Sequence, residues 1–270
     1  MESFLREHFK KGVIWLAIFV AFTLLIKVID VKAIGPEDST VGFAALNGFI
    51  ARIIGQHPFF ETLTKLLGVL ALATAAGFAA VGVLQFVRTR SLREVDREII
   101  ILGVFYAVVL LAYVFFELCV VNYRPVILDE GLEASYPSSH TVLVICIMMT
   151  APAQISRLTK NAVLCEAARI ASYVIIAVMV VGRLISGVHW FTDIIGGILL
   201  SAALVYFYNG AMEFFGCELP EKKTKRKIRI PKIKVSLPSG GSGGSHSAPE
   251  PEDSSKNRYS SRGGGAHLAK

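Results

Sequence analysis

The stretch IIILGVFYAVVLLAYVFFELCVV, residues 99–121, decides the fold class. Its side chains are almost all apolar, and Glu117 is the only charged one. A helix needs about 20 consecutive apolar residues to cross the hydrocarbon core of a bilayer. Soluble domains rarely carry so long a run without a charged face. The stretch therefore predicts a transmembrane helix.

Similar runs recur along the chain, which has 270 residues, 53% of them hydrophobic, and a mean hydropathy of +0.56. They predict an all-α, polytopic membrane protein whose six transmembrane helices form one bundle. The first run has no small-residue cleavage site after it, so we interpret it as a retained helix. The expected spans are 12–29, 63–87, 99–121, 141–155, 170–186 and 194–215.

A longer segment, residues 30–62, joins the first two spans. Gly35 and Pro36 mark a turn within it. The stretch GFAALNGFIARIIG, residues 42–55, mixes small and apolar side chains. This composition predicts a helix that lies on the membrane surface.

Positive charge is concentrated beside the spans, and the formal net charge is +7. This placement favours membrane lipids over nucleic acid as partners. Four basic segments fall on one side of a six-span bundle: residues 6–11, 88–97, 157–169 and 222–234. The positive-inside rule makes that side cytoplasmic and places both termini there. The loop at 122–140 and the turn at 187–193 then face outward.

The chain divides into a membrane domain, residues 1–217, and a tail, residues 218–270. The tail begins with the basic run KKTKRKIRIPKIK, residues 222–234, which is typical of a juxtamembrane anchor to anionic lipid. From about residue 236 it is rich in Gly, Ser and Pro, which predicts disorder.

Two outward-facing stretches carry most of the chemistry: NYRPVILDEGLEASYPSSH, residues 122–140, and GRLISGVHWFTDIIGG, residues 182–197. Each polar residue alone has an ordinary explanation, such as a helix cap or a cation at the membrane boundary. Their combination at one membrane face indicates a functional site, because ionisable groups there are costly. The candidate site residues are Arg124, Ser138, Ser139, His140, Arg183, His189 and Asp193.

This set of side chains suits phosphoryl transfer. Guanidinium groups bind phosphoryl oxygens through forked, charge-assisted hydrogen bonds. An imidazole held by a carboxylate can attack phosphorus, and a second imidazole can protonate the leaving group. His189 and Asp193 are four residues apart, so they share a face if the helix has begun.

Three motifs resemble the signatures of the type-2 phosphatidic acid phosphatase family, which read K-x6-RP, PSGH and SR-x5-H-x3-D. They are RP at 124–125, PSSH at 137–140 and R-x5-H-x3-D at 183–193. The resemblance implies a six-helix membrane lipid phosphatase that works without a metal or cofactor through a phosphohistidine. By position, it implies that His189 is the nucleophile, Asp193 its orienting partner and His140 the acid. Phosphate-binding roles fall to Arg124, Arg183, Ser138 and Ser139.

The chain departs from the family pattern at three positions. Ser139 replaces the family glycine, and Gly182 replaces the serine before Arg183. Glu117 stands seven residues before Arg124, where the family has lysine. An ionised carboxylate there would repel phosphate, so we expect Glu117 to pair with Arg124 or Arg183, or else to stay protonated.

The leading hypothesis is a phosphatase acting on the outer face on an isoprenoid or glycerolipid phosphate, with undecaprenyl diphosphate ranked first. The alternatives are a lipid-phosphate-binding pseudoenzyme and a phosphotransferase, with Glu117 modulating activity. No N-x-[ST] sequence occurs, which favours a bacterial cell membrane as the location.

Overall fold

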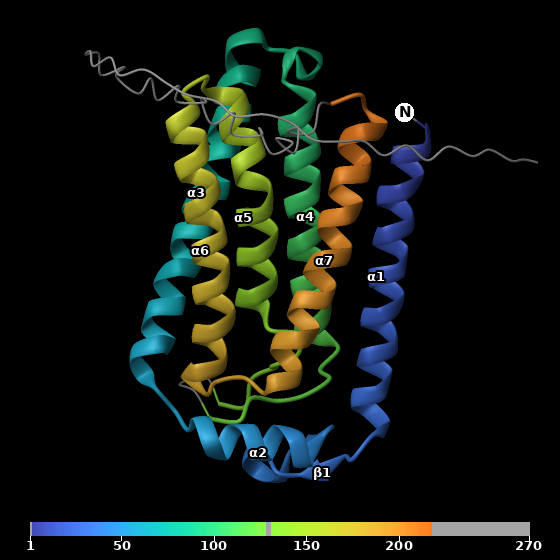
Figure 1. Cartoon of the computed structure of the whole chain (residues 1–270), viewed down its shortest axis with the longest axis vertical. Helices are drawn as coiled ribbons and strands as arrows, with labels where there is room; N and C mark the ends of the chain where they lie inside the picture. The colour runs from blue at the N-terminus through green and yellow to red at the C-terminus, as the bar shows by residue number, and fades with distance from the viewer. Residues whose placement is uncertain (1, 128–130, 218–270) are drawn as a thin grey trace, which may run out of the picture. The chain divides into compact units, whose positions relative to one another are not determined.

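The computed structural model describes residues 2–127 and 131–217. Within these ranges six helices are long and apolar enough to cross a membrane (Figure 1). They are α1 (Glu2–Val28), α3 (Pro58–Thr89), α4 (Arg97–Leu118), α5 (Ser139–Leu158), α6 (Ala162–Ser186) and α7 (Phe191–Phe214). The predicted six-span, all-α membrane architecture is therefore confirmed. The proposed tail, residues 218–270, lies outside the described residues.

Helices α5 and α7 form the centre of the bundle. In the most apolar stretch of each helix, 50% of the residues of α5 and 56% of those of α7 are buried inside the protein. The corresponding share is 11–28% in the other four spans. Gly196 and Gly197 of α7 allow this close packing, since a Cβ on Gly196 would lie 2.2 Å from the Tyr136 ring. The ring of Tyr136 stacks on Phe19 of α1, and its hydroxyl is 2.7 Å from Thr23 Oγ1. The segment before α5 is thus anchored in the core.

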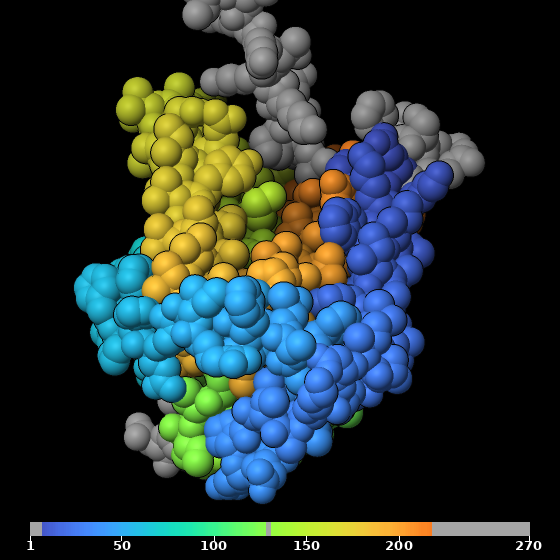
Figure 2. All heavy atoms as spheres, turned by 60° about the horizontal axis from the view of Figure 1, so that its bottom comes forward, coloured from blue at the N-terminus to red at the C-terminus, as the bar shows by residue number. Residues whose placement is uncertain are grey.

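One end of the bundle is covered by the segment between α1 and α3. It contains a two-stranded antiparallel sheet, β1 (Lys32–Ala33) and β2 (Thr40–Val41), and the helix α2 (Ala44–Ile54). This segment also contains the short helix η1 (Pro36–Asp38). A second short helix, η2 (Leu92–Glu94), lies between α3 and α4. Helix α2 lies across the bundle end, as Figures 1 and 2 show. The helix predicted within residues 42–55 is therefore present.

Helix α2 is joined to the start of α7 by a buried amide. Asn47 Nδ2 donates to Thr192 Oγ1 at 3.0 Å, and the Thr192 backbone N–H donates to Asn47 Oδ1 at 3.2 Å. Asn47 Nδ2 also donates to the Gly42 carbonyl. These bonds connect the covering segment to the helix that carries Asp193.

The fourth and fifth spans are longer than predicted. Helix α6 begins at Ala162 rather than at 170, since the Asn161 side chain accepts from the N–H groups of Val163 and Leu164. Glu166 and Arg169 interrupt the apolar run there but form an ion pair along one helix face. Hydropathy therefore marks the apolar part of this helix, while its cap marks the true start.

Candidate active site

The turn between α6 and α7 carries His189 at the covered end of the bundle. Gly187 makes this turn possible, because its φ is +74° and a Cβ there would lie 2.3 Å from the Gly55 carbonyl oxygen. The His57 N–H donates to the Ser186 carbonyl at 3.2 Å. The imidazole of His189 is therefore held by a turn that packs against the end of α2 and the start of α3.

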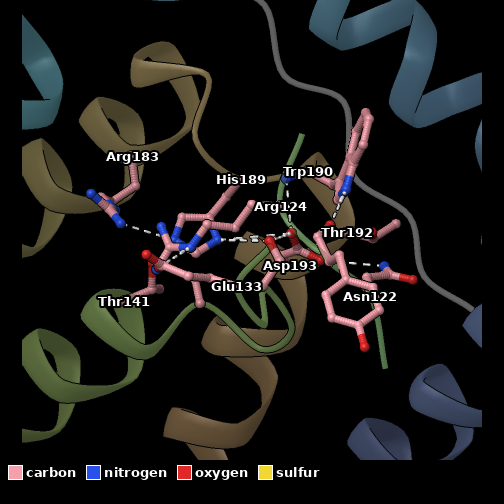
Figure 3. A network of polar contacts seen from close by, with 12 residues as sticks. Asn122, Arg124, Glu133, Thr141, Arg183, His189, Trp190, Thr192 and Asp193 are labelled. Atoms are coloured by element: carbon pink, nitrogen blue, oxygen red, sulfur yellow. Dashed lines mark hydrogen bonds and ion pairs between the residues drawn. The ribbon is translucent and has the colours of Figure 1, made fainter. Parts of the chain in front are cut away.

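Both ring nitrogens of His189 have partners, and these define its tautomer (Figure 3). Arg183 Nη2 is 2.9 Å from Nε2, and a guanidinium can only donate. In the neutral ring Nε2 therefore accepts and Nδ1 carries the proton. Nδ1 lies 3.1 Å from Ser135 Oγ, to which it donates. The lone pair needed for nucleophilic attack is thus on Nε2, the side that faces Arg183.

Ser135 lies between His189 and Asp193 and was not identified from the sequence. Its hydroxyl donates to Asp193 Oδ2 through a short hydrogen bond. The direct separation of His189 Nδ1 from Asp193 Oδ2 is 3.8 Å, too long for a hydrogen bond. The expected proximity of His189 and Asp193 is present, but the contact between them runs through a serine.

Asp193 is completely buried, and its other contacts hold it in place. Oδ2 accepts from the Trp190 N–H at 2.8 Å, and Oδ1 accepts from Asn122 Nδ2 at 3.4 Å. The Trp190 indole N–H donates to the Tyr123 carbonyl at 2.7 Å. The carboxylate therefore organises both the first turn of α7 and the loop that follows α4.

The environment of His189 favours its neutral form. Burial lowers the pKa of His189 well below its usual range, and the positive charges of Arg183 and Arg124 act in the same direction. A neutral imidazole retains the lone pair that nucleophilic attack requires.

The two candidate arginines have different partners. Arg183 is almost fully buried, and besides His189 its Nη1 donates to Thr64 Oγ1 of α3 at 3.4 Å. Its Nε–H has no hydrogen-bond partner within the described ranges. Arg124 Nε lies 2.9 Å from Glu133 Oε2, and the Arg124 backbone N–H donates to the Glu133 carbonyl at 3.1 Å. Arg124 is therefore already paired with a carboxylate from its own loop.

The expected pairing of Glu117 with Arg124 or Arg183 is wrong. Arg124 forms an ion pair with Glu133, and Arg183 contacts Thr64 and His189. Glu117 instead lies near the exposed end of α4, beside the Tyr113 side chain one helical turn earlier. The sequence pattern missed Glu133 because nothing in the loop indicates how its chain folds back on itself.

The serines and His140 surround the first turn of α5. Ser138 is fully buried, its N–H donates to the Asp193 carbonyl at 3.0 Å, and its Oγ accepts from Thr141. Ser139 and His140 are more open and line a cavity. His140 Nδ1 is buried and has no hydrogen-bond partner in the described part of the chain. Ser138 thus supports the local fold, whereas Ser139 and His140 face open space.

The cavity has a volume of about 620 Å³ and lies between α3, α4 and α5. Leu72, Val109 and Leu143 contribute to its mostly apolar wall. Polar side chains lie in its wall as well: Lys65, Glu117, Ser135, Ser139 and His140. Ser135 lines the cavity and also contacts His189, which is not among the lining residues. Within the described ranges, no three His, Cys, Asp or Glu side chains are grouped as a metal site would require.

Comparison with known proteins agrees with the motifs. A sequence model of the PAP2 superfamily matches residues 114–216, the range that contains all seven candidate site residues. This segment, which is less than half of the chain, is similar to the PAP2 superfamily. The chain is also similar to a solved structure described as a transmembrane PAP2-type phosphatidylglycerolphosphate phosphatase from Bacillus subtilis.

The structural similarity concerns the fold. The TM-score is 0.52 and the sequence identity 19%, with 76% of this chain and 96% of the other covered. The search of curated proteins found no match. The solved structure therefore supports the transmembrane fold, and the sequence model supports a likeness to PAP2 proteins over residues 114–216. The roles of individual residues rest on the geometry above.

Proposed function

We propose that this protein is an integral-membrane lipid phosphatase that acts through a phosphohistidine at His189. The observation that carries the proposal is the orientation of this imidazole. Nδ1–H is directed toward Ser135 and Asp193, and Nε2 faces a guanidinium. A nucleophilic nitrogen beside a cation suits attack on an anionic phosphoryl group.

In the proposed first step, His189 Nε2 forms a bond to phosphorus and the bond from phosphorus to the lipid oxygen breaks. Arg183, Arg124 and Ser139 bind the phosphoryl oxygens. His140 protonates the departing oxygen. Ser135 and Asp193 stabilise the positive charge that develops on the phosphorylated imidazole.

In the second step, water attacks phosphorus while His140 accepts its proton. The P–N bond breaks, inorganic phosphate leaves and Nε2 regains its lone pair. In the structure, Arg183 donates to Nε2 of His189. Before the first step, the phosphoryl group must therefore replace the guanidinium at Nε2, and the guanidinium then binds the phosphoryl oxygens. The Arg183 Nε–H, which has no hydrogen-bond partner among the described residues, supports this exchange because it leaves a donor for the ligand.

The substrate is proposed to be a lipid phosphate. The apolar walls of the cavity suit a hydrocarbon chain, and His140 at its edge would lie beside the leaving group. The candidates are an isoprenoid diphosphate, which we rank first, phosphatidylglycerol phosphate and phosphatidate. The proposed location is the outer face of a bacterial cell membrane, with both termini cytoplasmic.

The test is phosphate release from these lipids by the purified full chain in detergent with chelator present. We expect release from at least one lipid and a loss of at least 10³-fold, as an order of magnitude, in His189→Ala. His140→Ala should impair natural lipids more than a substrate with a good leaving group. Near-normal release by His189→Ala would reject the mechanism.

Glu117 supports two alternatives, since it places a carboxylate in the wall of the cavity. A pseudoenzyme would bind lipid phosphate without releasing phosphate. A phosphotransferase would consume the lipid phosphate and transfer the group to an added alcohol acceptor. Measuring substrate loss, free phosphate and acceptor phosphate in one assay separates the three functions.

A further inference from the structure

We propose that Lys65 of α3 binds the phosphoryl group of the substrate, which gives the site a third cation from outside its three sequence motifs. The proposal rests on the function proposed above and assigns a ligand-binding role to a residue that the motifs do not contain.

The first observation is the place of Lys65 in the cavity. Among the described residues that line it, Lys65 is the only lysine or arginine. His140, Ser135 and Ser139 line the same cavity. The ammonium lies within electrostatic reach of the His140 imidazole. An anionic head group that enters this cavity would therefore meet Lys65 together with the candidate acid.

The second observation is the alignment of α3 with the site. Thr64 accepts a hydrogen bond from Arg183, and a Cβ on Gly68 would lie 3.2 Å from His140 Cδ2. Lys65 comes between these positions, and Glu61, Lys65 and Gly68 fall on one helix face because they are three or four residues apart. The same surface of α3 thus contacts both the arginine and the histidine of the proposed mechanism.

The third observation is the ion pair that holds the ammonium. Lys65 Nζ is 2.6 Å from Glu61 Oε1, and Glu61 is the less exposed partner, with 22% of its side chain accessible against 58%. Arg124 is held in the same manner by Glu133. In each case a carboxylate orients the cation. A phosphoryl dianion could compete for the cation by providing more negative charge.

A lysine at a membrane boundary can also extend toward water with no further role. The two explanations differ in what an anion does. A lysine that merely reaches water would leave anion binding unchanged when removed, whereas a phosphate-binding lysine would not.

The experiment measures equilibrium binding of orthovanadate, a phosphate analogue, to the purified full chain in detergent by calorimetry. We expect Lys65→Ala to raise the dissociation constant about tenfold and Lys65→Arg to stay within about threefold of wild type. Glu61→Gln should bind vanadate at least as tightly as wild type. Lys32→Ala is the matched control, because Lys32 pairs with Asp30 at the same bundle end but does not line the cavity.

A rescue variant tests whether a loss of affinity in Lys65→Ala reflects the missing cation or a misfolded protein. Glu117→Lys places a cation in the same cavity from α4, so adding it to Lys65→Ala should restore most of the lost affinity. Thermal unfolding of each variant monitors the fold. Unchanged vanadate affinity in Lys65→Ala, or equal losses in Lys32→Ala, would overturn the proposal.

Vanadate binding also separates this inference from the proposed function. A wild type that binds vanadate through Lys65 but releases no phosphate would reject hydrolysis and retain the phosphate-binding role. A wild type that neither binds vanadate nor releases phosphate would overturn both. If wild type and Lys65→Ala release phosphate equally well and with the same KM, the role of Lys65 is rejected and the proposed function is retained.

Discussion

At the scale of single residues, the arrangement of His189 depends on a hydroxyl that joins it to Asp193. Ser135→Ala should lower kcat for phosphate release about 10- to 100-fold, the usual range for supporting partners of a reactive imidazole. KM should change little, since Ser135 is proposed to orient the ring. The steady-state assay on the preferred lipid measures both constants.

Ser201→Ala is the matched control for this substitution. Ser201 is also fully buried, but it lies about two helical turns after Asp193 and its hydroxyl donates to the Gly197 carbonyl within α7. It should keep kcat within about twofold. Equal losses in the two variants would show that Ser135 acts on packing rather than on His189.

The pH dependence of turnover follows from the pKa of His189, which lies well below its usual range. A lowered pKa keeps the imidazole neutral, and therefore nucleophilic, to a lower pH. The acid limb of kcat/KM attributable to the enzyme should lie below pH 6.5, once the ionisation of the substrate is accounted for. Arg124→Gln removes one positive charge that lowers this pKa, so its acid limb should move upward. An acid limb at or above pH 6.5 in wild type would contradict the proposed state of His189.

The sequence located the candidate residues but not their partners. Arg124, His189 and Asp193 were found because their types and spacings form motifs within short stretches. Ser135, Lys65 and the pairing of Glu133 with Arg124 were not predicted, because they depend on how separate segments meet. A serine two residues before a proline carries no signal of its own until the 122–140 loop is seen against α7.

At the scale of elements, the turn that carries His189 depends on Gly187. Gly187→Ala should impair both stability and turnover, because a Cβ there meets the Gly55 carbonyl as well as an unfavourable positive φ. The backbone conformation alone costs about 1–2 kcal/mol for a residue other than glycine. Thermal unfolding and the kcat of phosphate release measure the two effects.

Gly216→Ala is the control that separates the cost of a positive φ from the steric clash of a Cβ with the Gly55 carbonyl. Gly216 has a φ of +70°, no atom of the described residues lies within 4 Å of a Cβ there, and it lies beyond the far end of α7. It should lose stability of the same order as the strain alone while keeping kcat. If Gly187→Ala behaves no differently, the contact with Gly55 is unimportant for the position of His189.

Helix α2 is expected to support the site through Asn47. Asn47→Ala leaves the buried N–H of Thr192 without its partner and should cost about 1–3 kcal/mol of stability. It should also lower kcat, because Thr192 adjoins Asp193. Asn161→Ala is the comparison: it removes the α6 cap at the opposite end and should cost about 1 kcal/mol without affecting kcat. Unchanged kcat in Asn47→Ala would mean that α2 covers the site without positioning it.

The bounds of a helix could be predicted from the sequence only where the run of apolar residues extends over the whole helix. The spans at α4 and α7 agree closely with the apolar runs, since these runs end near the helix ends. Helix α1 ends where predicted but begins at Glu2 rather than at 12, because its first residues are helical without being apolar. The start of α6 was missed because Glu166 and Arg169 break the pattern without breaking the helix. The position of α2 across the bundle end could not be derived, since it depends on one buried asparagine rather than on periodicity.

At the scale of the whole molecule, the two ends of the bundle differ in charge and content. The loops at the end opposite the site carry Arg90, Arg93 and Lys160, while the site end carries α2 and the motif-bearing loops (Figure 1). The positive-inside rule assigns the basic end to the cytoplasm. It follows that the site should be open to the outer surface.

Labelling of single cysteines in intact cells tests this orientation. Cys119 and Cys165 are first replaced by serine, since both are at least partly exposed, while the buried Cys146 and Cys217 remain. Thr40→Cys, at the exposed first position of β2, should react with an impermeant maleimide. Arg93→Cys, at an exposed position of η2, should react only after the cells are permeabilised. Labelling of both after permeabilisation shows that each thiol is reactive. The reverse pattern would place the site in the cytoplasm and remove outer-leaflet lipid phosphates as substrates, because the head group must reach His189 from the side on which the cavity opens.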